Sequence, residues 1–267
     1  MAYDLIIVGG GRIGAALARG LVAASFCAPA DMAVVESVKE RREELTVELD
    51  CEILASLELD HVGPASGVVL CVKPDQAEGA ARLIGACGAT RLLSVVAGLS
   101  TARLEAVMPQ PVAVVRAMPN TPVLVGKGAS AVAGGAHVTK DDLDWASSVL
   151  GSVGVVVRLA ERHLDAVTGL TGSMPAYLYL VVEALIEAGV HQGLTREVSH
   201  DMVIASFEGA GALLARSGET PEELRSQVTS PGGTTAAGLR MLEGRAVRAA
   251  FLEAVAAATE RSRQLGR

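Results

Sequence analysis

Three glycines near the amino end of the sequence have the spacing of a loop that can hold a phosphate group. The segment Gly9-Gly10-Gly11-Arg12-Ile13-Gly14 follows an apolar run directly, and a helical pattern begins at once after it. In this setting Gly9 permits a tight turn, Gly11 lets the backbone approach a pyrophosphate, and Gly14 allows close helix–strand packing. The amides of the helix N-terminus would then face the phosphate oxygens. We therefore predict a dinucleotide site, against the alternative of a glycine-rich turn with only a structural role.

An acidic residue lies where such a site would use one. Glu36 lies 22 residues beyond the last of these glycines and ends the second predicted strand. A carboxylate there accepts hydrogen bonds from ribose hydroxyls and repels a 2′-phosphate, which favours NADH over NADPH. NADPH stays open as the alternative cofactor. In that case Glu36 faces solvent, and a phosphate is held by the polar residues that follow, namely Ser37, Lys39 and Arg41 or Arg42.

Two further strand ends carry candidate contacts for the dinucleotide. Cys71-Val72-Lys73-Pro74 ends one predicted strand, and Ser94-Val95-Val96-Ala97-Gly98 ends the next with small residues that let a nicotinamide–ribose come close. Lys73 could equally be a solvated residue of a turn. The predicted cofactor contacts are Val8, Gly9, Gly10, Gly11, Arg12, Ile13, Gly14, Glu36, Ser37, Cys71, Val72, Lys73, Pro74, Val96, Ala97 and Asn120.

Short β-branched runs alternate with alanine-rich stretches of helical period through the first half of the chain. The runs lie at 5–8, 32–35, 67–72, 91–96, 111–116 and 153–157, with a further candidate at 129–133. Apolar strands that alternate with helices predict a parallel sheet buried on both faces. We therefore expect an α/β fold that begins with a Rossmann-like, doubly wound, mainly parallel sheet.

The second half of the chain is predicted to be all helical. From Glu161 onward no clear β run is present, and helices are predicted at 162–190, 195–217, 221–228, 234–243 and 245–264. Several of these have apolar faces with few charges, which a second copy of the chain would bury. We expect a dinucleotide-binding domain at 1–160 and a helical dimerisation and substrate-binding domain at 161–267.

The composition argues against several classes of function. The 267 residues carry a net charge of −7 and only 3% aromatic residues, so nucleic-acid binding is not expected. Four cysteines without CxxC spacing and five histidines without a close pair argue against a disulfide framework and a metal site. No uncharged run reaches the roughly 18 residues of a membrane span, and the amino end lacks a basic leader. We expect a soluble, cytoplasmic protein without a membrane or nucleic-acid partner.

Three segments are hard to explain by packing alone. They read VRAMPNTP at 115–122, DAVTGLTGSMPAY at 165–177 and VTSPGGTTAAGL at 228–239. Together with the glycine motif and the VKP turn at 72–74, they make the chain resemble the Δ1-pyrroline-5-carboxylate reductases nearly end to end. The SPGGTT loop is the most specific of these segments, since it belongs to the family signature. The resemblance implies NADH- or NADPH-dependent reduction of a cyclic imine carboxylate to L-proline, the last step of proline biosynthesis.

The resemblance also implies how residues 230–235 hold the substrate. Two glycines free this loop to turn amide groups inward at the start of a helix, which makes a cradle for an anion. The family threonine that matches Thr235 hydrogen-bonds the ring nitrogen, and we predict Thr235 as the catalytic residue. The other predicted substrate contacts are Ser230, Gly232, Gly233 and Thr234, with Glu161 and Gln227 nearby. In the family the helical domain interleaves into a homodimer, with this loop near the partner's cofactor domain, and larger assemblies of dimers are possible.

The chain departs from the family pattern at two positions, and two other functions are alternatives. The family usually reads GSGPAY where this chain has Met174 within 172–177, so a related cyclic imine is the alternative substrate. Gly14 replaces an alanine that many members carry, a change expected to be harmless. A β-hydroxyacid dehydrogenase would need a catalytic lysine on a long interdomain helix, but Lys140 is the last lysine. A non-catalytic dinucleotide-binding regulator is the other alternative, and the intact SPGGTT loop argues against it.

Overall fold

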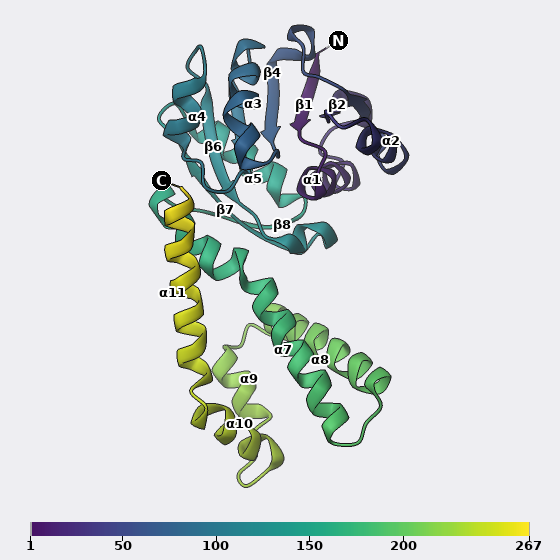
Figure 1. Cartoon of the computed structure of the whole chain (residues 1–267), viewed down its shortest axis with the longest axis vertical. Helices are drawn as coiled ribbons and strands as arrows, with labels where there is room; N and C mark the ends of the chain where they lie inside the picture. Colours follow the sequence, from purple (N-terminus) through teal and green to yellow (C-terminus); the bar gives the residue numbers. More distant parts are fainter. Residues whose placement is uncertain (1, 267) are drawn as a thin grey trace. The chain divides into compact units, whose positions relative to one another are not determined.

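The computed structural model describes residues 2–266, which include one eight-stranded sheet (Figure 1). The strands are β1 (Tyr3–Val8), β2 (Met32–Val35), β3 (Glu52–Leu54), β4 (Val62–Leu70), β5 (Arg91–Ser94), β6 (Ala113–Met118), β7 (Gly128–Gly134) and β8 (Gly154–Arg158). Their order across the sheet is β3-β2-β1-β4-β5-β6-β7-β8. All neighbouring pairs of these strands are parallel except β6 and β7. The predicted mainly parallel, doubly wound sheet is confirmed.

Helices cover both faces of the sheet. They are α1 (Arg12–Ala23), α2 (Lys39–Glu48), α3 (Pro74–Ala86), α4 (Thr101–Val107) and α5 (Lys140–Gly151). Along β1, Leu5 and Ile7 pack in a core with α1 and α5, whereas Ile6 and Val8 pack in a second core with α3 and α4. Successive strand residues point to opposite faces, so a strand with apolar layers on both sides needs a continuous apolar run.

Two features of the sheet were not predicted. Strand β3 has only three residues, all partly or fully exposed at the sheet edge, so it carries no apolar pattern. The direction of β7 follows from the short link after β6, which holds one 3₁₀ turn, Thr121–Val125. A parallel return needs a crossover of about a dozen residues or more, so β7 runs antiparallel to β6.

The rest of the chain is helical, as predicted. The helices are α6 (Leu164–Val167), α7 (Met174–His191), α8 (Arg196–Arg216), α9 (Pro221–Gln227), α10 (Thr234–Gly244) and α11 (Val247–Leu265), with a π-helical turn at Thr168–Gly172 between α6 and α7. By packing, the described residues 2–173 and 257–266 form one compact unit and residues 174–256 another. This division differs from the predicted boundary at 160/161. Leu164 is buried against β7, and Ser262 of α11 bonds Asp165, so both segments belong with the sheet.

The unit at 174–256 leaves much apolar surface uncovered. Tyr179, Leu180, Met202 and Leu252 are each more than 60% exposed. By length and composition the helical stretch Glu161–His191 could also cross a membrane, with a mean hydropathy of 1.3. An exposed apolar surface of this kind marks a place where another protein surface or a membrane can bind.

Gly67 of β4 gives a test of the packing between the sheet and α5. A Cβ at this position would overlap the indole ring of Trp145, and the guanidinium carbon of Arg91 lies 4.7 Å from that ring's centroid. We expect Gly67→Ala to lower the free energy of unfolding by about 1–3 kcal/mol, because the ring must move within a packed layer. Urea unfolding followed by circular dichroism measures the change.

Gly79→Ala in α3 is the matched control for this substitution. Among the described residues, nothing lies within 4 Å of a Cβ placed on Gly79. Alanine should therefore raise the stability by about 0.5–1 kcal/mol, the usual gain inside a helix. Equal stabilities of the two variants would contradict the contact between Gly67 and Trp145.

Candidate cofactor and substrate sites

The glycine loop after β1 is held tightly between its neighbouring strands. Gly9 has a φ of +108°, and a Cβ on it would lie 2.7 Å from the carbonyl carbon and oxygen of Cys71. Its amide donates a hydrogen bond to the carbonyl oxygen of Val35 (2.8 Å). A side chain at Gly9 would therefore both strain the backbone and push the loop away from β4.

The N-terminus of α1 is open to an anion. Its cap residue is Gly11, and within residues 2–266 no side chain accepts a hydrogen bond from the first-turn amides. The first turn also contains no acidic residue. These amides need an acceptor, and together with the helix dipole they fit the pyrophosphate of a dinucleotide.

The surroundings of Gly14 disagree with the expectation that an exchange between glycine and alanine at this position is harmless. A Cβ on Gly14 would overlap the carbonyl oxygen of Gly9 and lie 3.3 Å from the side chain of Ile7. Alanine at this position therefore requires a shift of the glycine loop, so the exchange is not neutral in this backbone. The close approach of α1 to β1 is the reason.

Glu36 reaches back over the glycine loop from the end of β2. Its carboxylate accepts hydrogen bonds from the amides of Gly10 (3.0 Å) and Val38 (2.9 Å). Two neighbouring arginines also donate hydrogen bonds to backbone carbonyl oxygens of this region. Arg41 donates from Nε to the carbonyl oxygen of Gly10 (3.0 Å), and Arg42 donates to the carbonyl oxygens of Glu36 (2.9 Å) and Ser37 (2.7 Å).

A cavity of about 460 Å³ gathers the carboxyl ends of β1, β2 and β4. Predicted cofactor residues in its lining are Val8, Gly9, Gly11, Glu36, Ser37, Cys71, Val72 and Lys73. Two groups of residues in this lining were not predicted from the sequence. One follows β3 and consists of Ala55, Ser56 and Leu57, and the other lies on α3 and consists of Gln76, Ala80, Leu83 and Ile84. The α3 residues recur at helical spacing after the VKP turn, which was a usable signal. Burial raises the pKa of the Cys71 thiol to about 12, so this thiol carries no charge at physiological pH.

The remaining predicted cofactor residues lie outside this lining, and they are Gly10, Arg12, Ile13, Gly14, Pro74, Val96, Ala97 and Asn120. Gly10 and Gly14 shape the loop, and Pro74 begins α3. Both polar atoms of the Asn120 side chain form hydrogen bonds. Its Oδ1 accepts from the amide of Ala129 (2.9 Å), and its Nδ2 donates to the carbonyl oxygen of Thr171 in the π-helical turn (3.2 Å). Asn120 therefore ties β7 to that turn.

The predicted substrate loop is a tight turn in front of α10. The Gly233 amide donates to the Ser230 carbonyl oxygen (3.0 Å), and Gly232 has a φ of +74°. Proline at the second and glycine at the third position are typical of a type II turn. Gly233 caps α10, and in the described part of the chain no side chain caps this helix. The amides of its first turn, which contains Thr234 and Thr235, are therefore open to an anion.

The side chains of the other two predicted substrate residues form hydrogen bonds to residues of their own unit. Glu161 accepts hydrogen bonds from the amide and hydroxyl of Thr101 (2.8 Å each) and from Arg116 (3.2 Å). Gln227 is exposed and donates from Nε2 to Glu219 (2.6 Å).

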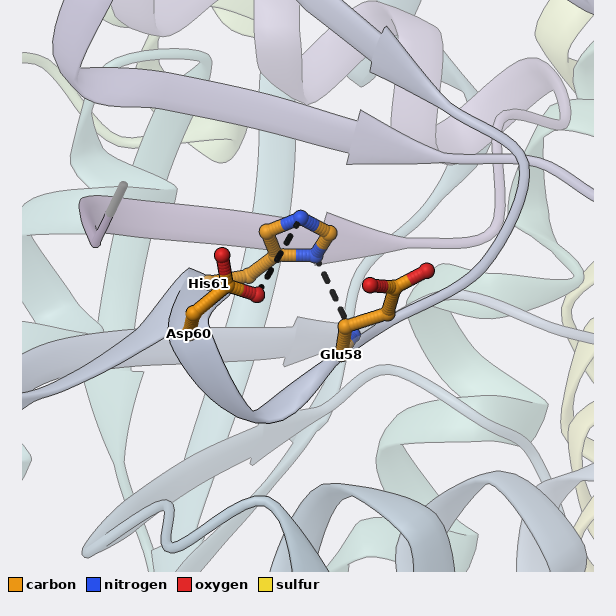
Figure 2. Close-up of side chains that lie close together, drawn as sticks. All are labelled: Glu58, Asp60 and His61. Carbon is orange, nitrogen blue, oxygen red and sulfur yellow. Dashed lines mark hydrogen bonds and ion pairs between the residues drawn. The ribbon is translucent and has the colours of Figure 1, made fainter.

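Glu58, Asp60 and His61 form one cluster of possible metal ligands among the described residues (Figure 2). His61 accepts a hydrogen bond at Nδ1 from the Glu58 amide (3.1 Å) and lies 5.9 Å from the ring of Tyr3. The hydrogen bond between His61 and the Glu58 amide is part of the capping box of the short 3₁₀ turn Leu59–His61. Capping and ring packing explain the cluster without an ion.

Gly11 allows dinucleotide binding to be separated from folding. Within the described residues, nothing lies within 4 Å of a Cβ placed on Gly11, although the residue lines the cavity. We expect Gly11→Ala to keep the melting temperature of the free protein but to raise the Kd of NADH about tenfold or more, because the methyl group takes the place of a phosphate oxygen. Calorimetric titration gives the Kd. An unchanged Kd would show that the loop does not hold the pyrophosphate.

Comparison with known proteins agrees with this geometry. Residues 161–265 match the family model for pyrroline-5-carboxylate reductase dimerisation, and residues 4–98 match that for NADP oxidoreductase, coenzyme F420-dependent. A pyrroline-5-carboxylate reductase of Corynebacterium melassecola is 41% identical, over 98% of this chain and 98% of its own. A solved pyrroline-5-carboxylate reductase from Coxiella burnetii has a TM-score of 0.92 at 28% identity, over 99% of each chain. The Plasmodium falciparum pyrroline carboxylate reductase, solved with NADP bound, has a TM-score of 0.83 at 29% identity, over 99% of this chain and 98% of its own. The chain belongs to the pyrroline-5-carboxylate reductase family, which confirms the resemblance of its motifs.

Proposed function

We propose that this chain reduces Δ1-pyrroline-5-carboxylate to L-proline, with NADH or NADPH as the hydride donor. The observation that carries the proposal is that α1 and α10 both begin behind a glycine, with first-turn amides that no side chain caps in the described residues. One of these helix N-termini suits a pyrophosphate and the other a carboxylate. Those are the anions that this reaction brings together, and membership in the family supports the same reaction.

The chemistry demands little acid–base catalysis from the protein. When bound, the reduced nicotinamide supplies a hydride, which adds to the imine carbon, and the ring nitrogen carries a proton and becomes a secondary amine. A protonated imine is already electrophilic. The residues of the chain therefore have to bind and orient the ring, which can supply most of the reduction of the barrier.

The loop at 230–235 suits the substrate in its charge. A carboxylate at the first-turn amides of α10 interacts favourably with the helix dipole, and no acidic residue of that turn opposes it. Ser230, Gly232, Gly233 and Thr234 would surround the carboxylate. Thr235, which is partly exposed in this turn, would hydrogen-bond the ring nitrogen.

We also propose a homodimer formed through the C-terminal helices. The exposed apolar residues of α7, α8 and α11 and the match of 161–265 to a dimerisation model support it. A second copy would cover this surface, as expected of a soluble, cytoplasmic enzyme. The substrate loop of one protomer would then serve the cofactor site of its partner, and larger assemblies of dimers would leave this arrangement intact.

The contacts of Glu36 support a preference for NADH. The two backbone amides fix its carboxylate at the cavity wall beside Ser37, where the ribose hydroxyls of an adenosine would lie. Arg41 also lines the cavity, but its guanidinium bonds Gly10, Glu44 and Glu48. A 2′-phosphate would meet a fixed negative charge and an arginine that is already paired.

The reaction is tested by the loss of NADH or NADPH absorbance with pyrroline-5-carboxylate, and its site by Thr235→Ala. We expect the imine to oxidise NADH or NADPH. In the reverse direction, 2-hydroxy and 3-hydroxy acids should not reduce NAD⁺ or NADP⁺. Thr235→Ala should lower kcat by the equivalent of about 1–3 kcal/mol, because a hydrogen bond to a charged nitrogen is lost. Thr235→Ser keeps the hydroxyl and should keep most of the activity. Unchanged turnover in Thr235→Ala would refute the role of the hydroxyl.

Cofactor preference gives a second test, on Glu36. The unsubstituted protein should bind NADH more tightly than NADPH, and Glu36→Gln should shift the ratio of kcat/KM toward NADPH by about tenfold, because the charge facing the 2′-phosphate is removed. Glu40→Gln, on the exposed side of α2, is the control and should leave the ratio as it was. A tenfold or greater preference of the unsubstituted protein for NADPH would overturn the assignment.

A further inference from the structure

The loop between β5 and α4, residues 95–100, brings two predicted cofactor contacts to the carboxyl edge of the sheet. Val96 is only 3% exposed, whereas Ala97 is exposed. Gly98 follows with a φ of +78°. The side chain of Val96 thus belongs to the core, and a ligand would meet the backbone of this loop and the methyl group of Ala97. The conformation of the loop decides what surface that ligand meets.

Glu161 anchors the end of this loop from a distant part of the sequence. Its Oε1 accepts from the amide of Thr101 (2.8 Å) and from Arg116 of β6 (3.2 Å), and its Oε2 accepts from the Thr101 hydroxyl (2.8 Å). Thr101 is 4% exposed, and the side chains of Arg116 and Glu161 are 12% and 26% exposed. Hydrogen bonds to a shielded carboxylate are short and strong, so the first residue of α4 is fixed in place.

A second anchor meets the same loop at Gly98. The place of a Cβ on Gly98 lies 3.3 Å from the carbonyl oxygen of Leu265, at the end of α11. That end of α11 is itself held, because Ser262 donates to Asp165 (2.7 Å). Asp165 follows Glu161 by one helical turn. The short helical segment that carries Glu161 and Asp165 therefore bonds the start of α4 directly and also holds the end of α11 that lies beside Gly98.

This network borders an open volume. A cavity of about 450 Å³ at the carboxyl ends of β5 and β6 is lined in part by Gly98, Ser100, Arg116 and Glu161. In a doubly wound sheet the pyrophosphate lies at the β1 turn, and the second half of a dinucleotide crosses to the strands beyond β4. The loop at 95–98 lies on that second side.

We propose that Glu161 and Thr101 are positioning residues, which hold the loop at 95–98 in the conformation that receives the nicotinamide end of the cofactor. Glu161 acts through Thr101 and Arg116, a role that differs from the substrate contact predicted from the sequence. The inference rests on the proposed use of a nicotinamide dinucleotide. A loop that is already held loses little freedom on binding, so the anchors raise affinity for the part of the ligand it meets.

The test compares two ligands that differ only in the nicotinamide end. ADP-ribose retains the adenosine and pyrophosphate of NADH but has no nicotinamide. By calorimetric titration of the full chain, Thr101→Val and Glu161→Gln should each raise the Kd of NADH about tenfold and leave the Kd of ADP-ribose within about twofold. In turnover, kcat should fall more than the KM of the imine rises, because the hydride donor is misaligned.

Two further variants separate positioning from folding. Thr101→Ser keeps the hydroxyl and should restore NADH affinity, and Ser148→Ala removes an exposed hydroxyl that bonds only within α5 and should change neither Kd. Equal losses of NADH and ADP-ribose affinity, or an unchanged Kd of NADH in both test variants, would overturn the proposal. The ratio of the two Kd values does not depend on the imine. It can therefore be read even if the chain fails to reduce pyrroline-5-carboxylate, and that failure would count against the proposed function alone.

Discussion

The N–H groups of a helix's first turn need hydrogen-bond acceptors, and both proposed ligand sites depend on that requirement. Four other helices meet it with their own side chains, since Ser100, Thr139, Thr195 and Thr220 each accept a hydrogen bond from the turn that follows. In front of α1 and α10 the cap residue is a glycine, and among the described residues no side chain takes its place. An anion bound at either N-terminus would supply the missing acceptors, so that binding would also stabilise the first turn of the helix.

The sheet determines how the cofactor site is assembled. Parallel strands end at one edge, so segments far apart in the sequence meet there, and the cavity is lined by residues from Val8 to Ile84. Each segment is then fixed by backbone contacts. Gly9 is held between β2 and β4, and Glu36 and Arg41 bond the amide and the carbonyl of the same residue, Gly10. Gly9 and Gly10 of the loop that would face a pyrophosphate are thus held by backbone contacts without a ligand.

Local signals made much of the fold predictable. The strand–glycine–helix order at β1 and α1, the helices after residue 161 and the turn at Ser230–Gly233 depend on neighbours in sequence, and the structure contains all of them. What could not be predicted depends on distant pairs. Arg41 reaches Gly10 across 31 positions, and Glu161 reaches Thr101 across 60. Strand β3 is defined only by its pairing with β2, and the return of α11 to the first unit only by tertiary contacts such as Ser262 with Asp165.

The return of residues 257–266 has a consequence for biosynthesis. The helical unit at 174–256 is an insertion within the sheet-containing unit, since the chain enters and leaves it at two points. The nascent sheet can pair its strands long before α11 exists, because domains generally fold as they are synthesised. The surface beside Gly98 nevertheless stays bare until α11 has been made. In a newly made chain the eight strands are thus complete before the surface beside Gly98 is, and the proposed nicotinamide side of the site would be the last part to form.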